Sequence, residues 1–181
     1  MIESIPYVLT GIGIIISILY YTSVLRNANK TQQMQLETRQ AQLFMQIHNK
    51  WSDIEYKTEA RKLLRWEFKD TDEYLEKYSG PDKVEYEGHI SAINTYLEGV
   101  AVLIDRDLVD ASLVDELMSG YIVQYWEKFG PVHIELRSRL NYPHLSEWVE
   151  YLYNIIKKIT IGQHPELETN KIKLSLNKPN R

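Results

Sequence analysis

The chain of 181 residues contains no cysteine. This absence excludes disulfide bonds, thiolate metal sites and a cysteine nucleophile, and it agrees with a reducing compartment. A strong net charge is also lacking, because 21 lysines and arginines stand against 25 aspartates and glutamates, for a formal net charge of −4. A balance this close to neutrality argues against nucleic acid as the main partner. Hydrophobic residues at 44% and charged residues at 25% are typical of a globular chain with room for one soluble domain.

Charge is absent from the first long stretch of the sequence as well. Residues 5–24, IPYVLTGIGIIISILYYTSV, carry no charged side chain. A helix of this length covers about 30 Å, which is the thickness of the hydrocarbon core of a bilayer. Tyr7 lies near one end and Tyr20 and Tyr21 near the other, where amphipathic rings favour the headgroup region. The sequence therefore predicts a transmembrane helix over residues 5–25.

A cleaved signal peptide is the alternative interpretation of this segment. It requires a basic start, a shorter apolar core and a cleavage site of small residues. The start instead carries Glu3 and no lysine or arginine, and YTSVLRN offers no such site, so we expect an uncleaved anchor. Arg26, Lys30 and Arg39 follow the segment, and positive charge stays on the cytoplasmic side. We therefore expect a single-pass protein of the plasma membrane with residues 1–4 outside the cell and the rest of the chain in the cytoplasm.

Glycine and proline are missing from residues 26–50, which are rich in glutamine, leucine and arginine. These residues are good helix formers, so we expect the helix to continue past the membrane as a juxtamembrane stalk. Apolar residues at helical spacing begin at Leu36 and continue to Trp51, which favours a stalk whose far end packs into its own domain. The three or four heptads that indicate a coiled coil are not found, and the sequence leaves open whether the stalk pairs in a homo-oligomer.

Strand-like alternation is not sustained anywhere, and the apolar residues after the stalk recur at helical spacing. The fold class is therefore all-α, with a bundle of about four to six helices as the cytoplasmic domain over residues 51–160. Periodicity then ends, and we expect a mostly disordered tail over residues 161–181. The predicted helix boundaries are the capping-box pattern Ser52–Glu55, Pro81 at a first helical position, Asp110 as an N-cap, and a kink or helix end at Gly130–Pro131.

Recognisable catalytic and metal-binding patterns are also missing. None of the five histidines lies three residues after a glutamate, as in di-iron bundles. The H-E-x-x-H, Walker A and G-x-S-x-G patterns are absent. Asp105, Asp107 and Glu116 fit three positions of a calcium loop, but Asp110 stands where that loop requires glycine. We therefore predict no catalytic, metal-binding or cofactor-binding residues and no cofactor, and we favour a protein that is not an enzyme.

A cluster of basic side chains on one helix face is the one surface feature that stands out in the sequence. It is the candidate interaction face for an acidic partner or for anionic lipid headgroups. Glutamates on the same helix dilute its charge, which favours the alternative of a solvated outer surface. A helical stalk would also hold this face about 40 Å from the membrane, too far for headgroup contact unless the chain folds back. The face consists of Lys57, Arg61, Lys62 and Arg65.

Three stretches together resemble a known family. They are QAQLFMQIHNKWSD at residues 40–53, YLEGVAVLIDRDLVDASLVDELMSGYIVQYWEKFGP at residues 96–131 and EWVEYLYNIIKK at residues 147–158. The most telling pieces are the pair Glu98–Gly99, the turn from Asp107 to Asp110, and Trp126 followed by Phe129.

Over roughly residues 20–160 these pieces make the chain similar to a family of N-terminally membrane-anchored, all-helical prokaryotic proteins with a domain of unknown function. Arg106 and Asp107 stand where a glycine would be usual, which is a departure from the family at that turn. The resemblance implies an anchored helical domain, and it supplies no activity, cofactor or functional residue.

Three hypotheses for the function follow. The leading one is a membrane-tethered interaction or regulatory module, or an accessory subunit, with the lipid bilayer (through residues 5–25) and an unknown protein as partners. The second is a helical ligand-binding or enzymatic bundle, which a closed apolar pocket lined by His89 or Glu98 would favour. The third is contact of the basic face with anionic lipid or nucleic acid, of which nucleic acid is the less favoured because the net charge is mild.

Overall fold

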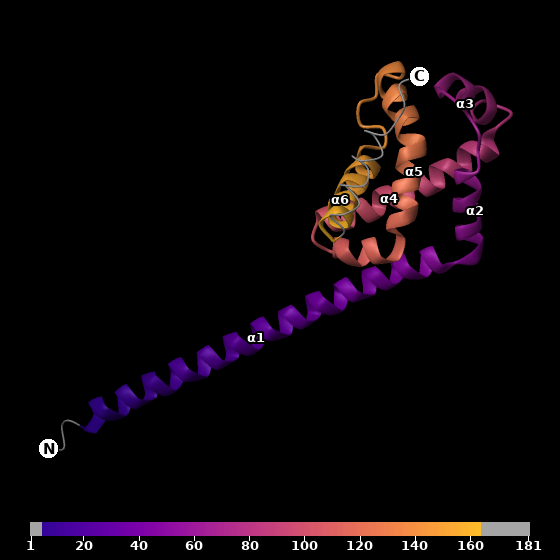
Figure 1. Cartoon of the computed structure of the whole chain (residues 1–181). Helices are drawn as coiled ribbons and strands as arrows, with labels where there is room; N and C mark the ends of the chain where they lie inside the picture. Colours follow the sequence, from indigo (N-terminus) through magenta and orange to yellow (C-terminus); the bar gives the residue numbers. More distant parts are fainter. Residues whose placement is uncertain (1–4, 164–181) are drawn as a thin grey trace. The chain divides into compact units, whose positions relative to one another are not determined.

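The computed structural model describes residues 5–163, and this part of the chain is helical without a strand. The all-α fold class predicted from the sequence is confirmed. The chain divides into two compact units, Met1–Gln42 and Leu43–Arg181. Most of the tail predicted to be disordered, residues 164–181, lies outside the described residues. The helices, labelled in Figure 1, are α1 (Ile5–Ser52), α2 (Ile54–Leu64), α3 (Thr71–Tyr78), α4 (Val84–Asp105), α5 (Ala111–Arg139) and α6 (Glu147–Gln163).

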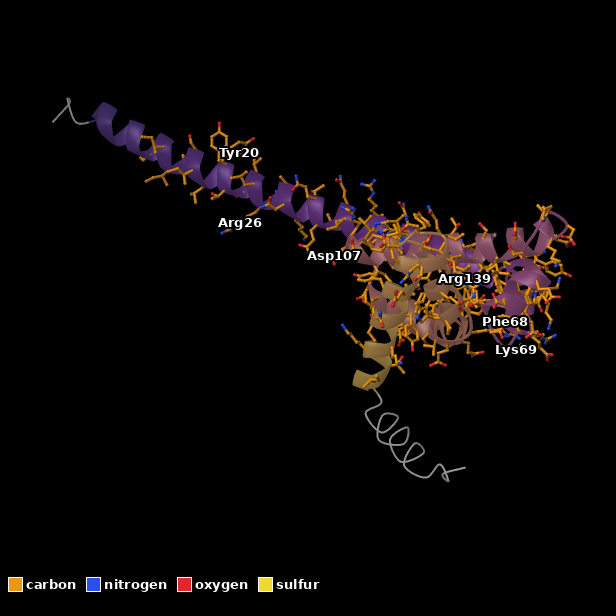
Figure 2. All side chains as sticks on the ribbon, turned by 90° about the horizontal axis from the view of Figure 1, so that it is seen from above. Tyr20, Arg26, Phe68, Lys69, Asp107 and Arg139 are labelled. Carbon is orange, nitrogen blue, oxygen red and sulfur yellow. The ribbon has the colours of Figure 1, made fainter. Side chains whose placement is uncertain are left out.

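The first unit consists of one helix, the N-terminal part of α1. This helix is long and apolar enough to cross a membrane, and its large apolar side chains between Ile12 and Leu25 are exposed. Figure 2 shows Tyr20 and Arg26 projecting from it. The Ser17 hydroxyl donates to the Gly13 carbonyl at 2.8 Å. Because this hydrogen bond is internal to the helix, the hydroxyl needs no water and fits a hydrocarbon environment.

The core of the second unit lies where α6 packs against both α4 and α5. On α4 the apolar residues at helical spacing from Ile90 to Ile104 are buried, but Tyr86, one turn before them, is 44% exposed. The reason is that α4 begins at Val84, so Tyr86 lies in its first turn, where its ring contacts Trp66 at 5.5 Å between centroids. The largest fully buried side chains are Tyr125, Phe129, Leu63, Ile93, Leu97, Ile122, Leu152, Ile156, Val100, Val114 and Val149.

Two predicted helix starts are shifted. Ser52 is the last residue of α1, and the N-cap of α2 is Asp53, whose Oδ1 accepts from the Tyr56 amide at 2.8 Å. Aspartate caps a helix as well as serine does, so the chain turns one residue later than the capping-box pattern suggested. Pro81 is not a first helical residue, because α4 begins at Val84. The N-cap predicted at Asp110 is confirmed.

The predicted break in α5 is also in a different place. The helix does not end at Gly130–Pro131 but continues to Arg139, and the residue with non-helical geometry is Met118, at φ −149° and ψ 16°. The turn before α5 uses a left-handed residue, Asp107 at φ 54°. This conformation favours glycine, and aspartate is one of the better-tolerated substitutes for it.

Candidate functional site

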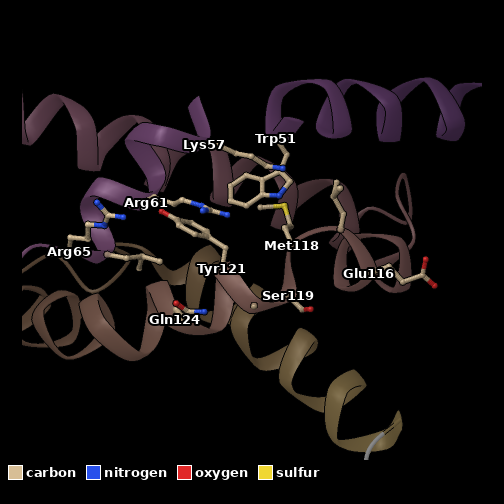
Figure 3. Close-up of a pocket in the computed structure, with 12 residues that line it drawn as sticks. Trp51, Lys57, Arg61, Arg65, Glu116, Met118, Ser119, Tyr121 and Gln124 are labelled. Carbon is tan, nitrogen blue, oxygen red and sulfur yellow. The ribbon is translucent and has the colours of Figure 1, made fainter. Parts of the chain in front are cut away.

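A groove of about 590 Å³ lies in the second unit between α2 and the first half of α5 (Figure 3). Its volume is in the range of pockets that hold small ligands or the side chains of a partner, roughly 300–1,000 Å³. Trp51 from the end of α1, Lys57 and Arg61 from α2, and Met118 and Tyr121 from α5 all line it. The groove therefore combines residues that are far apart in the sequence.

The cations of the groove come from one face of α2. Lys57, Arg61 and Arg65 are spaced four residues apart, which places them one above the other along the helix. Lys62 lies about 100° further around the helix, and its Nζ pairs with Glu59 Oε1 at 2.6 Å. The structure thus brings three members of the predicted basic face together and leaves the fourth on a neighbouring surface.

Glutamates on α2 do not neutralise these cations. Glu59 lies with Lys62 on the other surface, where its Oε2 is also 3.2 Å from His89 Nδ1. The hydrogen bond from Lys62 is the main reason that the pKa of the Glu59 carboxyl is lowered. Within the described residues neither Arg61 nor Arg65 has an ion pair, and both side chains are exposed. The dilution expected from the sequence therefore acts on another face of the helix.

One carboxylate, Glu116 on α5, lines the groove together with the three cations. This leaves an excess of two positive charges in a space that side chains partly enclose. The Lys57 ammonium lies over the Trp51 ring, 5.8 Å from its centroid, instead of beside a carboxylate. A cation above an indole ring gains about 0.5–1 kcal/mol at exposed sites, and it remains available to an incoming anion.

The wall of the groove is aromatic. The ring centroids of Trp51 and Tyr121 lie 4.9 Å apart, and the ring planes meet at 54°. The two side chains are 7% and 8% exposed. Figure 3 shows the Tyr121 ring extending from α5 toward Arg61. The Tyr121 hydroxyl oxygen is buried without a hydrogen-bond partner among the described residues. Burial raises the pKa of this hydroxyl, so it keeps its proton and remains a donor.

The irregular geometry of α5 falls at the edge of the groove. Ser119 and Gly120, which follow the non-helical Met118, both line it. A methyl group at Gly120 would meet no other atom within 4 Å, so this side of the groove is open. In the described part of the chain, no hydrogen bond engages the Ser119 hydroxyl or the Gln124 amide, which also lines the groove. The groove can therefore offer neutral donors beside its cations.

A second polar cluster lies in the interior of the same unit. Ser146 Oγ donates to Asn94 Oδ1 at 3.1 Å and lies 3.2 Å from His133 Nδ1, while Tyr125 Oη donates to the same Asn94 oxygen at 3.4 Å. A serine beside a histidine is a nucleophile–base pair in many hydrolases. Here Ser146 is 2% exposed, and its hydroxyl proton is directed to Asn94. The cluster therefore holds the start of α6 against α4 and α5.

The hypothesis of a ligand-binding or enzymatic bundle predicts a closed apolar pocket lined by residues such as His89. The Nε2 atom of His89 lies 3.7 Å from Oε1 of Glu85, four residues earlier on α4, and its Nδ1 faces Glu59. The hollow that they line with Lys62 and Trp66 measures about 150 Å³. Across residues 5–163 no group of three or more histidines and carboxylates is arranged to hold a metal ion. His89 thus takes part in a surface network of polar contacts with two glutamates.

Sequence reasoning missed the groove as a cavity. It named the cations but assigned Trp51 to packing within the domain, because helical spacing alone does not show where two helices leave a gap. The groove forms where α2 and α5 lie side by side, as Figure 3 shows.

The comparisons with known proteins concern the family of the chain. No curated protein and no solved structure matches it significantly. A family model matches residues 7–156, which include the apolar segment of α1 and the groove. That model covers most of the 181 residues, and the chain therefore belongs to the family described as a domain of unknown function (DUF4760).

Proposed function

We propose that this chain is a membrane-tethered interaction module that binds an acidic partner protein in the groove between α2 and α5. The observation that carries the proposal is the alignment of Lys57, Arg61 and Arg65 along an aromatic-walled groove that holds a single carboxylate. Arginine and aromatic residues are the side chains most enriched where binding energy concentrates in protein interfaces. Cations left without an ion pair there are available to neutralise an acidic segment of a partner.

Tethering is the first part of the proposal. The exposed apolar stretch of α1 would span the bilayer, and Arg26, Lys30 and Arg39 after it would keep the second unit on the cytoplasmic side. External protease added to right-side-out vesicles should leave a C-terminal tag intact and should digest it after the vesicles are opened. Digestion of the tag in sealed vesicles would overturn this topology.

Partner binding is the second part. Tagged full-length protein, purified from gently solubilised native membranes, should bring down a stoichiometric partner that quantitative mass spectrometry identifies. The double charge reversal Arg61→Glu and Arg65→Glu should abolish this association, because it turns the excess of positive charge in the groove into an excess of negative charge.

The matched control carries the same change of charge outside the groove. Lys62→Glu and Arg106→Glu reverse two exposed cations, whose side chains are 60% and 71% exposed, and this variant should retain the partner. Retention by the groove variant, loss in both variants, or a partner-free wild-type protein would each count against the proposal.

A further inference from the structure

We propose that the anion which the groove recognises is a phosphate monoester on the partner protein, an inference that rests on the function proposed above. Three cations and one carboxylate leave the groove with an excess of two positive charges. A phosphorylated side chain carries a charge of about −1.5 to −2 near neutral pH, whereas a carboxylate carries about −1. One phosphate group therefore balances the groove, while one carboxylate leaves it half compensated.

The placement of the two arginines suits a group with several acceptor oxygens. Arg61 lies on α2, Arg65 is the C-cap of this helix one turn later, and both line the groove. Side chains at this spacing start about 5–6 Å apart, so two guanidinium groups can reach one anion from the same side. Each guanidinium presents a planar fork of donors that matches phosphate oxygens. Lys57, one turn earlier, adds a point charge to the same face.

Neutral hydrogen-bond donors on α5 also favour a phosphate monoester as the ligand. The Tyr121 hydroxyl is buried and has no hydrogen-bond partner among the described residues. The Ser119 hydroxyl and the Gln124 amide also line the groove. The three oxygens of a phosphate monoester that are not esterified are strong acceptors, enough for donors on α2 and on α5 at once. A carboxylate with two oxygens engages fewer of them.

Calorimetric titration of the full-length chain in uncharged detergent tests this inference with two defined probes, N-acetyl-O-phosphoserine amide and N-acetyl-glutamic acid amide. The phosphoserine probe should bind about tenfold more tightly or better, because its phosphate carries more negative charge than a carboxylate and has a third acceptor oxygen. Its affinity should fall as the pH drops through about 6, where the phosphate loses its second negative charge.

The arginine forks are tested by a variant that keeps the charge. Arg61→Lys with Arg65→Lys retains both cations and removes the planar donors, so it should lower the preference for phosphoserine over glutamate and keep only the part that charge supplies. Lys62→Gln, outside the groove, should leave that preference unchanged. An equal unfolding midpoint of the variants in urea would show that the lysine variant is folded.

The outcomes separate this inference from the function on which it rests. Equal binding of both probes would refute the phosphate preference and leave an acidic partner in place. Binding of neither probe would refute the phosphate preference, and a wild-type chain that also brings down no partner would contradict both proposals. Displacement of the phosphoserine probe by nanodiscs that contain phosphatidic acid, but not by nanodiscs of neutral lipid, would assign the site to a lipid phosphate and overturn the partner-protein source.

Discussion

His133 should make the stability of the second unit depend on pH. Its side chain is 8% exposed and lies beside Ser146. Burial, and next to it the positive charge of Arg137, lower the pKa of this histidine from 6.5 to about 4. In the unfolded chain the imidazole returns to its ordinary pKa. Between these two values the unfolded chain therefore binds more protons than the folded chain does.

The sign and size of the effect follow from this difference. The contribution of His133 to the free energy of unfolding is fully present above pH 6.5 and is lost as the pH falls toward about 4. The whole difference between the pKa values of the unfolded and the folded chain corresponds to about 3 kcal/mol of folding stability. Between about pH 7.5 and pH 5 the expected loss in the free energy of unfolding is about 2 kcal/mol. Glu98 opposes this trend, because burial raises the pKa of its carboxyl.

Urea titration of the full-length chain in detergent, followed by tryptophan fluorescence, measures this loss. The four tryptophans are Trp51, Trp66, Trp126 and Trp148, all in the second unit, so the signal reports on that unit alone. The linear dependence on urea gives the free energy of unfolding at each pH.

The control compares two histidine substitutions. His133→Gln removes the buried titrating group and should lose most of the difference between the two pH values. His144→Gln removes a histidine whose side chain is 67% exposed and should keep that difference. Glu98 is present in both variants, so its opposing effect cancels in the comparison. A wild-type stability that is the same at both pH values, or an equal loss in His133→Gln, would refute the reasoning.

The same urea titrations check four further substitutions. Gly130→Ala should cost about 1–3 kcal/mol, because the new methyl group would lie 2.8 Å from Trp126 Cε2. Gly99→Ala meets nothing within 4 Å and should be neutral or stabilise by about 1 kcal/mol. Leu152→Ala, at a fully buried position of α6, should cost about 2–5 kcal/mol. Asp110→Ala should cost about 0.5–2 kcal/mol, because Asp110 caps α5. A cost for Gly99→Ala equal to that for Gly130→Ala would contradict the packing argument.

Local patterns predicted much of this fold. The stripe on α4 and the cap at Asp110 could be predicted because each depends on residues within one or two helical turns. The cations of the groove were found for the same reason, since their spacing of four residues is a local property. Lys62 was grouped with them because it is near in sequence, although it lies on a different surface of α2 and pairs with Glu59.

The remaining features depend on contacts between distant segments. Trp51 meets Tyr121 only when the end of α1 and the middle of α5 come together, and Ser146 meets Asn94 across α4 and the start of α6. No single helix carries a pattern for either contact. The break at Met118 was missed although the pair Ser119–Gly120, a sequence at which helices bend, follows it directly. Pro131, by contrast, marks a place where the helix continues.

The open side of the groove at Gly120 offers a position for a reporter. The chain has no cysteine, so a cysteine introduced there would be its single thiol and would accept one label without removing a native residue elsewhere. Space around the Cβ position of Gly120 leaves room for that side chain. A fluorophore or spin label at this position would therefore report the occupancy of the groove in intact membranes, where the bound partner and the anchored chain can be observed together.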